Sequence, residues 1–246
     1  MTADSEGGSA TVRRGPAVAS LVIVAGCAVG AAAFGVDYAS GLSAKILTAA
    51  TSSGFAWGLM ALLAGYANAR RAVIAASAGA GSLLAATGTY YTLILFVSQR
   101  WRVGTTESGS SGAMDGLMSV ARTASFWVVG SLLAGVVFGL LGRLIRHASP
   151  RRSAVLIGGL FALLSAQGWN NLAFHRIWLT MDEFGVGVLV YAVSIVVFSA
   201  LAAALLITLT NGWRHLVLTA AVAIAGSAVC MLLWQVAERI RESAVV

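Results

Sequence analysis

The stretch GVGVLVYAVSIVVFSALAAALLITL, residues 185–209, runs for 25 residues without a charge. A helix needs about 20 mainly apolar residues to cross the hydrocarbon core of a bilayer, so this stretch predicts a transmembrane helix. Six other apolar stretches accompany it. The predicted spans are at about residues 16–36, 46–68, 72–97, 123–144, 153–171, 185–209 and 216–236. The predicted fold class is therefore an all-α polytopic transmembrane bundle of about seven helices.

Composition agrees with this fold class. Of 246 residues, 59% are hydrophobic and only 10% are charged, which lies well outside the range of soluble domains. Seven spans leave no room for a separate soluble domain, so we expect residues 13–246 to form a single transmembrane domain. Residues 1–12 are rich in Gly, Ser, Thr and acids, which predicts a disordered cytoplasmic tail.

The charges between the spans indicate the orientation. If the spans alternate in direction, one side of the membrane collects nine arginines against Asp4 and Glu6, which accounts for the whole formal charge of +7. Those arginines are Arg13, Arg14, Arg70, Arg71, Arg143, Arg146, Arg151, Arg152 and Arg214. Basic residues resist translocation, so this side should be cytoplasmic, with the N-terminus inside and the C-terminus outside. The arginines suit contact with anionic membrane lipids, and we expect no nucleic-acid partner.

Two local patterns bear on how the helices pack. Thr51-Ser52-Ser53-Gly54 interrupts the second span, and such a break must be covered by neighbouring helices or line a cavity. Gly135 and Gly139, like Gly26 and Gly30, have the small-xxx-small spacing that lets helix backbones approach closely. The longest loop is expected at residues 98–122, and residues 172–184 form an amphipathic piece expected along the outer interface.

Nearly all polar side chains that could bind a ligand or take part in a reaction fall at the predicted outer ends of the spans. Asp37 is the carboxylate nearest the membrane interior, and burial there would make it a possible proton donor. Glu238 is a second candidate acid. The candidate substrate-binding residues are Trp57, Tyr90, Tyr91, Gln167, Trp169 and Asn170. An interfacial belt explains the aromatic residues equally well, because their rings suit the headgroup zone of any bilayer.

Several classes of site are excluded. No Walker-type phosphate loop is present, so the chain does not energise itself by nucleotide hydrolysis. The three histidines, His147, His175 and His215, all lie outside the expected spans, which argues against haem ligation within the membrane. No Cys, His or carboxylate cluster has ligand spacing, so we expect neither a metal nor a cofactor.

Four segments occur in an order that resembles a group of actinobacterial multi-span membrane proteins of unknown function. They are TAATSSGFAWGLMALLAGYANARR, GTYY, SFWVVGSLLAGVVFGLLGRLIR and LLSAQGWNNL, all within about residues 41–171. The resemblance implies a bacterial inner-membrane location and supplies no activity. In that group a glutamate often stands where this chain has Gln167.

In shape alone, the chain is similar to small integral-membrane terpene cyclases. That similarity implies an acid that protonates an epoxide or alkene, and an aromatic wall that stabilises the carbocation. Asp37 would be the acid, with Glu238 as the second candidate.

Three functions stay open on the sequence. The first is a metal-independent enzyme of terpene-cyclase type, acting on an isoprenoid or lipid-like molecule in an outward-half pocket. The second is a transporter or the substrate-binding membrane subunit of an uptake system, suggested by the broken second span. The third is a non-catalytic membrane partner protein.

Overall fold

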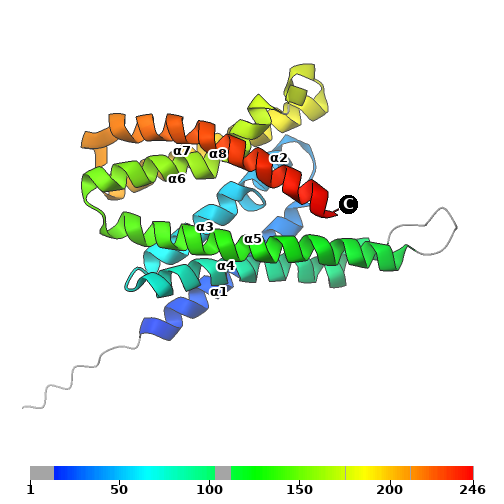
Figure 1. The fold of residues 1–246 in the computed structure, drawn as a ribbon. Coiled ribbons are helices and arrows are strands. Elements are labelled where there is room, and N and C mark those ends of the chain that lie inside the picture. Colours follow the sequence, from blue (N-terminus) through cyan, green and yellow to red (C-terminus); the bar gives the residue numbers. More distant parts are fainter. Residues whose placement is uncertain (1–13, 103–111, 175, 211, 246) are drawn as a thin grey trace, which may run out of the picture.

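The computed structural model describes residues 14–102, 112–174, 176–210 and 212–245, and every regular element in them is a helix (Figure 1). The α-helices are α1 (Arg14–Val36), α2 (Gly41–Thr51), α3 (Gly54–Ala67), α4 (Ala72–Leu93), α5 (Ala113–His147), α6 (Pro150–Ala173), α7 (Glu183–Leu209) and α8 (Leu216–Val245). Shorter elements are the π-helix η1 (Ile94–Ser98) and the 3₁₀ helices η2 (Arg100–Arg102), η3 (Arg176–Thr180) and η4 (Gly212–His215). The tail expected at residues 1–12 lies outside the described residues.

Counted with α2 and α3 as one broken rod, the described part of the chain forms seven rods that match the seven predicted spans. Five of them are long and apolar enough to cross a membrane: residues 41–67, 72–98, 113–147, 183–209 and 212–240. The described apolar part of α1, Ser20–Val36, is shorter. The predicted break is confirmed, since α2 ends at Thr51 and α3 begins at Gly54.

The boundaries of two rods differ from those predicted. Helix α5 begins at Ala113, so the last ten residues of the expected loop 98–122 are helical. Helix α8 continues to Val245, well beyond the expected end at 236. In both cases polar and charged residues continue the helix beyond its apolar stretch. A hydropathy pattern marks only the apolar stretch, so it does not locate these helix ends.

The connection between α6 and α7 replaces the amphipathic piece expected at 172–184. Helix α6 runs to Ala173, and η3 follows it before α7 begins. The indole of Trp178 donates a hydrogen bond to the carbonyl of Leu172 (3.0 Å). Asp182 caps α7 by accepting a hydrogen bond from the Gly185 N–H (2.6 Å), and this bond lowers the pKa of the Asp182 carboxyl group.

The rods pack in two groups. Helices α1, α3 and α5 contact α4, whereas α7 and α8 contact α6, and α2 leaves its own rod to lie against α7 (Figure 1). Helix α3 also contacts α5, α6 and α7, so it stands between the groups. Its Leu62 is fully buried beside Ile157, Leu160 and Leu164 of α6 and Ile195 of α7. The hydrophobic core therefore lies around α3.

Glycines bring the backbones of the first group into contact, as their spacing predicts. A Cβ atom on Gly139 of α5 would collide with the carbonyl oxygen of Ala75 on α4, and one on Gly65 of α3 would collide with the backbone of Gly139. Gly26 and Gly30 of α1 meet Ser82 and Ala86 of α4 in the same way. Close backbone approach supplies the dispersion contacts that hold helices together in lipid.

We predict that Gly139→Ala destabilises the protein by about 1–3 kcal/mol, the usual cost of forcing extra atoms into a packed contact. Thermal denaturation in one detergent measures the change. Gly159→Ala on α6 is the matched control, because a Cβ there meets no atom within 4 Å. An alanine in open space should leave stability unchanged or raise it. Equal melting temperatures for the two variants would contradict close packing at Gly139.

Candidate functional site

The break between α2 and α3 leaves backbone groups without helical partners in the middle of the bundle, and side chains from three places satisfy them. Ser53 caps α3 by accepting a hydrogen bond from the Ala56 N–H (3.3 Å). Gln167 of α6 accepts one from the Gly54 N–H (2.9 Å), and Trp57 donates its indole N–H to the carbonyl of Thr51 (3.0 Å). Unpaired backbone groups are costly in hydrocarbon, so the break depends on these partners.

A group of polar side chains surrounds the start of α3, and we call it the Glu238 cluster. It consists of Gln167 and Asn170 of α6, Tyr191 of α7, and Trp234 and Glu238 of α8. The Glu238 carboxylate accepts hydrogen bonds from the Trp234 indole (2.9 Å) and from the Asn170 amide (3.1 Å). Tyr191 lies close to Gln167 and within the electrostatic reach of Glu238. Helices α3, α6, α7 and α8 thus converge on one polar centre.

The amide oxygen of Asn170 has no partner among the described residues, although the Asn170 side chain is fully buried. The indole nitrogen of Trp169, the preceding residue of α6, is also buried and unpaired, but adjacent residues of a helix point in different directions. Buried polar atoms are nearly always hydrogen-bonded to protein, water or ligand, so the Asn170 oxygen marks a place in the cluster where a further polar group is expected.

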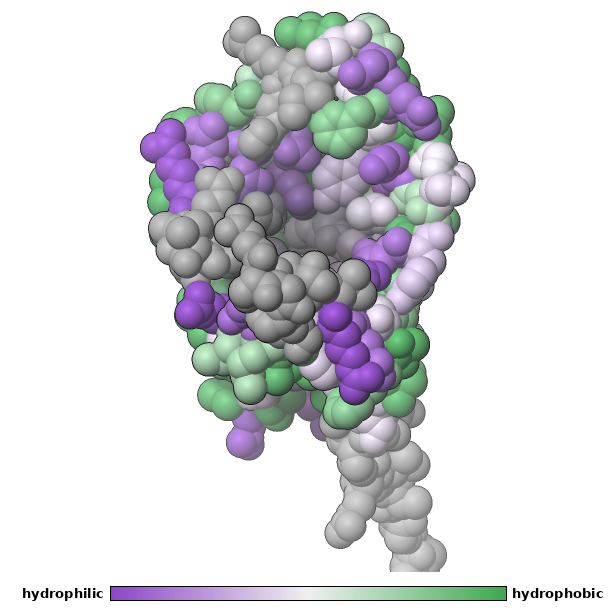
Figure 2. All heavy atoms as spheres, turned by 90° about the vertical axis from the view of Figure 1, so that its right-hand side faces the viewer, coloured by the Kyte–Doolittle hydropathy of each residue, from purple (hydrophilic) through white to green (hydrophobic). Residues whose placement is uncertain are grey.

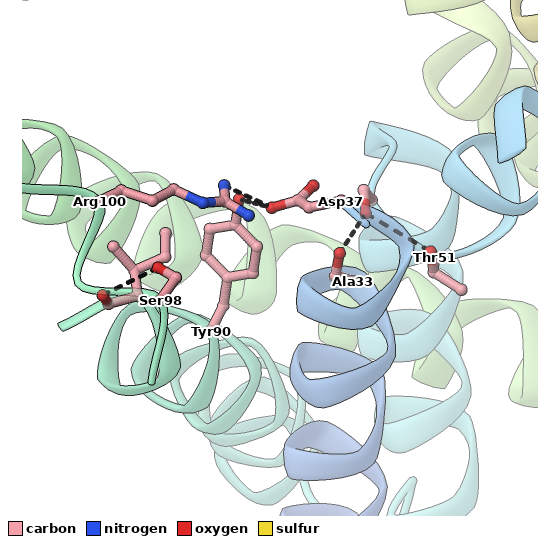
Figure 3. A network of polar contacts seen from close by, with 8 residues as sticks. Ala33, Asp37, Thr51, Tyr90, Ser98 and Arg100 are labelled. Atoms are coloured by element: carbon pink, nitrogen blue, oxygen red, sulfur yellow. Dashed lines mark hydrogen bonds and ion pairs between the residues drawn. The ribbon is translucent and has the colours of Figure 1, made fainter. Parts of the chain in front are cut away.

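A second group, the Asp37 cluster, lies at the C-terminal end of α1 (Figure 3). The Asp37 carboxylate accepts hydrogen bonds from the Tyr90 hydroxyl (3.0 Å) and from Arg100 (2.9 Å), the latter being an ion pair. The Arg100 guanidinium also lies over the rings of Phe34 and Tyr38. Burial works against its charge, but the hydrogen bonds to Asp37 and Tyr38 outweigh this effect and raise the pKa of Arg100.

Local backbone geometry brings Arg100 to Asp37. Helix α4 ends in the π-helical turn η1, and Gln99 after it adopts a left-handed conformation with φ of 48°. The chain therefore turns back over the end of α4, as the sticks in Figure 3 show for Ser98 and Arg100. Both π-helical turns and left-handed non-glycine residues are uncommon and concentrate at functional sites.

The break connects the two clusters. The Ser52 hydroxyl lies 3.5 Å from the carbonyl oxygen of Ala33 on α1. Two residues later, the backbone N–H of Gly54 donates a hydrogen bond to Gln167 of α6. The end of the molecule that carries both clusters is hollowed in its centre and rimmed by hydrophilic residues (Figure 2). Because α2 moves aside to α7, the start of α3 is left without a continuous helix above it.

The residues predicted from the sequence fall into these two clusters. Gln167, Asn170 and Glu238 come together at the start of α3, with Trp57 one turn into the same helix and Trp169 next to Asn170. Tyr90 joins Asp37, and Tyr91 packs against Tyr90 with ring centroids 5.3 Å apart. Asp37 is not the isolated, desolvated carboxylate that the sequence suggested, because Arg100 pairs with it.

Three contributors are not among the candidate residues named from the sequence: Arg100, Tyr191 and Trp234. Trp234 and Glu238 are four residues apart on one helix, a spacing that puts side chains in contact and could have indicated the pair. Tyr191 is the one large polar side chain within the uncharged stretch 185–209.

The chemistry of the Glu238 cluster favours a particular kind of polar group. The unpaired Asn170 oxygen is an acceptor, and a hydroxyl group can donate a hydrogen bond to it. The carboxylate and the surrounding aromatic rings disfavour an anion and suit a neutral or cationic group. Among the described residues, no three His, Cys, Asp or Glu side chains are placed to hold a metal ion.

Comparison with known proteins finds no match for this chain among protein-family models, curated proteins or solved structures.

We predict that Gln167→Ala destabilises the protein by about 1–3 kcal/mol, the cost of leaving a buried donor unpaired, here the Gly54 N–H. Thermal denaturation in detergent measures this loss. Gln235→Ala is the control, since Gln235 is a partly buried glutamine at a similar level of α8. If Gln167→Ala and Gln235→Ala have the same melting temperature, the hydrogen bond between Gly54 and Gln167 does not stabilise the break.

Proposed function

We propose that this chain is a seven-span protein of a bacterial inner membrane that binds a lipid-like, hydroxyl-bearing molecule, such as an isoprenoid alcohol, in its outer half. The convergence of α6, α7 and α8 on the start of α3, with the unpaired Asn170 oxygen among them, is the observation that carries the proposal. The hollow at this end offers an approach for the ligand (Figure 2).

The orientation follows from charge. The ends of the rods on the side of the α5–α6 connection carry the arginine excess found in the sequence, and the two clusters lie at the opposite end (Figure 1). Basic residues remain on the cytoplasmic side, so the clusters face outward. With seven crossings the two termini lie on opposite sides of the membrane.

If the site is catalytic, the acid-initiated chemistry expected from the sequence assigns the two carboxylates different roles. Glu238 lies beside the aromatic rings of Trp234 and Tyr191, where developing positive charge would be stabilised. Asp37 is occupied by Arg100 and Tyr90, which suits it to holding α1 and α4 together. Glu238 is therefore the better candidate for a proton donor, and Asp37 a positioning residue.

Transport is the second candidate, and the broken second span favours it. Helices interrupted near mid-membrane often form the substrate sites of transporters. Here the break lies next to an outward hollow, while the inner halves of α3, α4 and α5 are held together by glycine contacts. That combination is the arrangement of a carrier open to the outside.

The ligand proposal predicts that purified protein retains an added isoprenoid alcohol, farnesol, and that Asn170→Ala and Glu238→Gln each weaken retention about tenfold or more, as loss of a hydrogen bond to a charged group would. Native mass spectrometry in mild detergent measures the bound fraction. Glu183→Gln is the control, because Glu183 is an exposed acid at the same end of the bundle. If Asn170→Ala and Glu238→Gln both retain as much farnesol as the wild type, the Glu238 cluster is not the binding site.

The same samples separate the two candidates. Cyclised product, lost in Glu238→Gln and kept in Asp37→Asn, supports the enzyme. Accumulation of farnesol or of another solute in sealed vesicles, without any product, supports transport.

The orientation is tested by labelling single cysteines in intact cells with a membrane-impermeant maleimide, after Cys27 and Cys230 are replaced by alanine. Ser40→Cys, in the connection between α1 and α2, should react, whereas Ser149→Cys, between α5 and α6, should react only after the cells are opened. Both serines are exposed, so access to the reagent differs only by the membrane. The reverse pattern would invert the topology.

A further inference from the structure

A second cavity lies across the break from the Glu238 cluster, on the other half of the same rods. It is a groove of about 380 Å³ between α3 and α7, open to the surroundings of the bundle. Phe55, Leu59, Leu63 and Tyr66 of α3 form one wall, together with Ala50 of α2. The opposite wall consists of Phe198, Leu201, Ala202, Leu205, Leu206 and Leu209 of α7.

The groove begins where the second span breaks, since α2 ends against α7 there and α3 continues beside it. The rings of Phe55 and Phe198 meet at this point, with centroids 5.7 Å apart, and close the groove toward the Glu238 cluster. Leu201, Leu205 and Leu209 of the α7 wall are each about 60% exposed. Apolar side chains exposed along a concave surface of a membrane protein contact lipid acyl chains.

The length of the groove fits one leaflet. The helical rise from Phe55 to Tyr66 is about 16 Å at roughly 1.5 Å per residue, and the α7 wall from Phe198 to Leu209 has the same length. Half of the hydrocarbon core of a bilayer measures about 15 Å. A single acyl chain that begins at the membrane surface would therefore end near the Phe55–Phe198 pair.

The surface end of the groove is basic. Arg146 of α5 lies over the ring of Tyr66, 5.4 Å from its centroid, and donates hydrogen bonds through Nη1 to the carbonyls of Tyr66 (2.7 Å) and Ala67 (3.4 Å). Its Nε and Nη2 donors have no partner among the described residues, and the side chain is exposed. Arginine donors in this geometry recognise a phosphate group.

We propose that the α3–α7 groove is a binding site for an anionic phospholipid, with one acyl chain between the two helices and the phosphate on Arg146. The lipid occupies the space between α3 and α7 and ties the two helices together. That this leaflet is the inner one rests on the orientation proposed above, whereas the binding itself does not. The site is separate from the outer ligand site and has different ligand chemistry.

Native mass spectrometry of the full chain, with phosphatidylglycerol and phosphatidylcholine offered in equal amounts, tests the proposal. Wild type should retain phosphatidylglycerol in preference. Ala202→Phe, which puts a ring into the groove, should reduce that retention at least fivefold. Ala225→Phe is the matched control, because Ala225 is an exposed alanine on α8 away from the groove. Equal retention by the two variants would overturn the groove as the site.

Arg146 is tested separately, so that a folding defect in one variant leaves the other informative. Arg146→Gln should lower the preference for phosphatidylglycerol about fivefold, the effect of one basic residue near an anionic lipid. Arg146→Lys, which keeps the charge, should restore most of it. Equal binding of both lipids by wild type, or an unchanged preference in Arg146→Gln, would overturn the assignment. Neither result depends on farnesol retention, so this proposal and the outer site fail independently.

Discussion

The hydrogen bond from the Gly54 N–H to Gln167 is the contact on which the arrangement around the broken second span depends. A helix that stops inside a membrane leaves backbone donors and acceptors that water cannot satisfy. Here a side chain from another helix accepts the first donor of α3, while Ser53 and Trp57 satisfy groups nearby. The break is thus stable only in the presence of α6, and α6 is held at the break in return.

The interruption has a polar region on one side and an apolar region on the other. On one side α2 lies against α7, and side chains from α6, α7 and α8 meet at the start of α3. On the other side an apolar groove lies between α3 and α7. The polar site and the groove are therefore neighbours across the break, and the rings of Phe55 and Phe198 lie between them.

The rest of the bundle supplies a rigid frame for this irregular region. Glycines at the crossings of α1, α3, α4 and α5 bring backbones into contact, and the buried Thr87–Ser131 hydrogen bond (2.7 Å) joins α4 to α5 between them. Close packing of this kind leaves little freedom for relative motion. The Asp37–Arg100 ion pair closes the outer end of the frame, since it links α1 to the turn that follows α4.

The sequence by itself determined the helical class, the seven rods, the position of the break and the glycine contacts, because each of these depends on apolar runs and local spacing. It also placed Gln167, Asn170 and Glu238 at the same level of the bundle. It did not predict the ends of α5 and α8, where polar residues prolong a helix beyond the membrane. Only the tertiary structure decided that Arg100 pairs with Asp37, that Tyr191 and Asn170 meet Glu238, and that a groove opens between α3 and α7. These features depend on which faces of distant helices meet, and no local pattern in the chain encodes that.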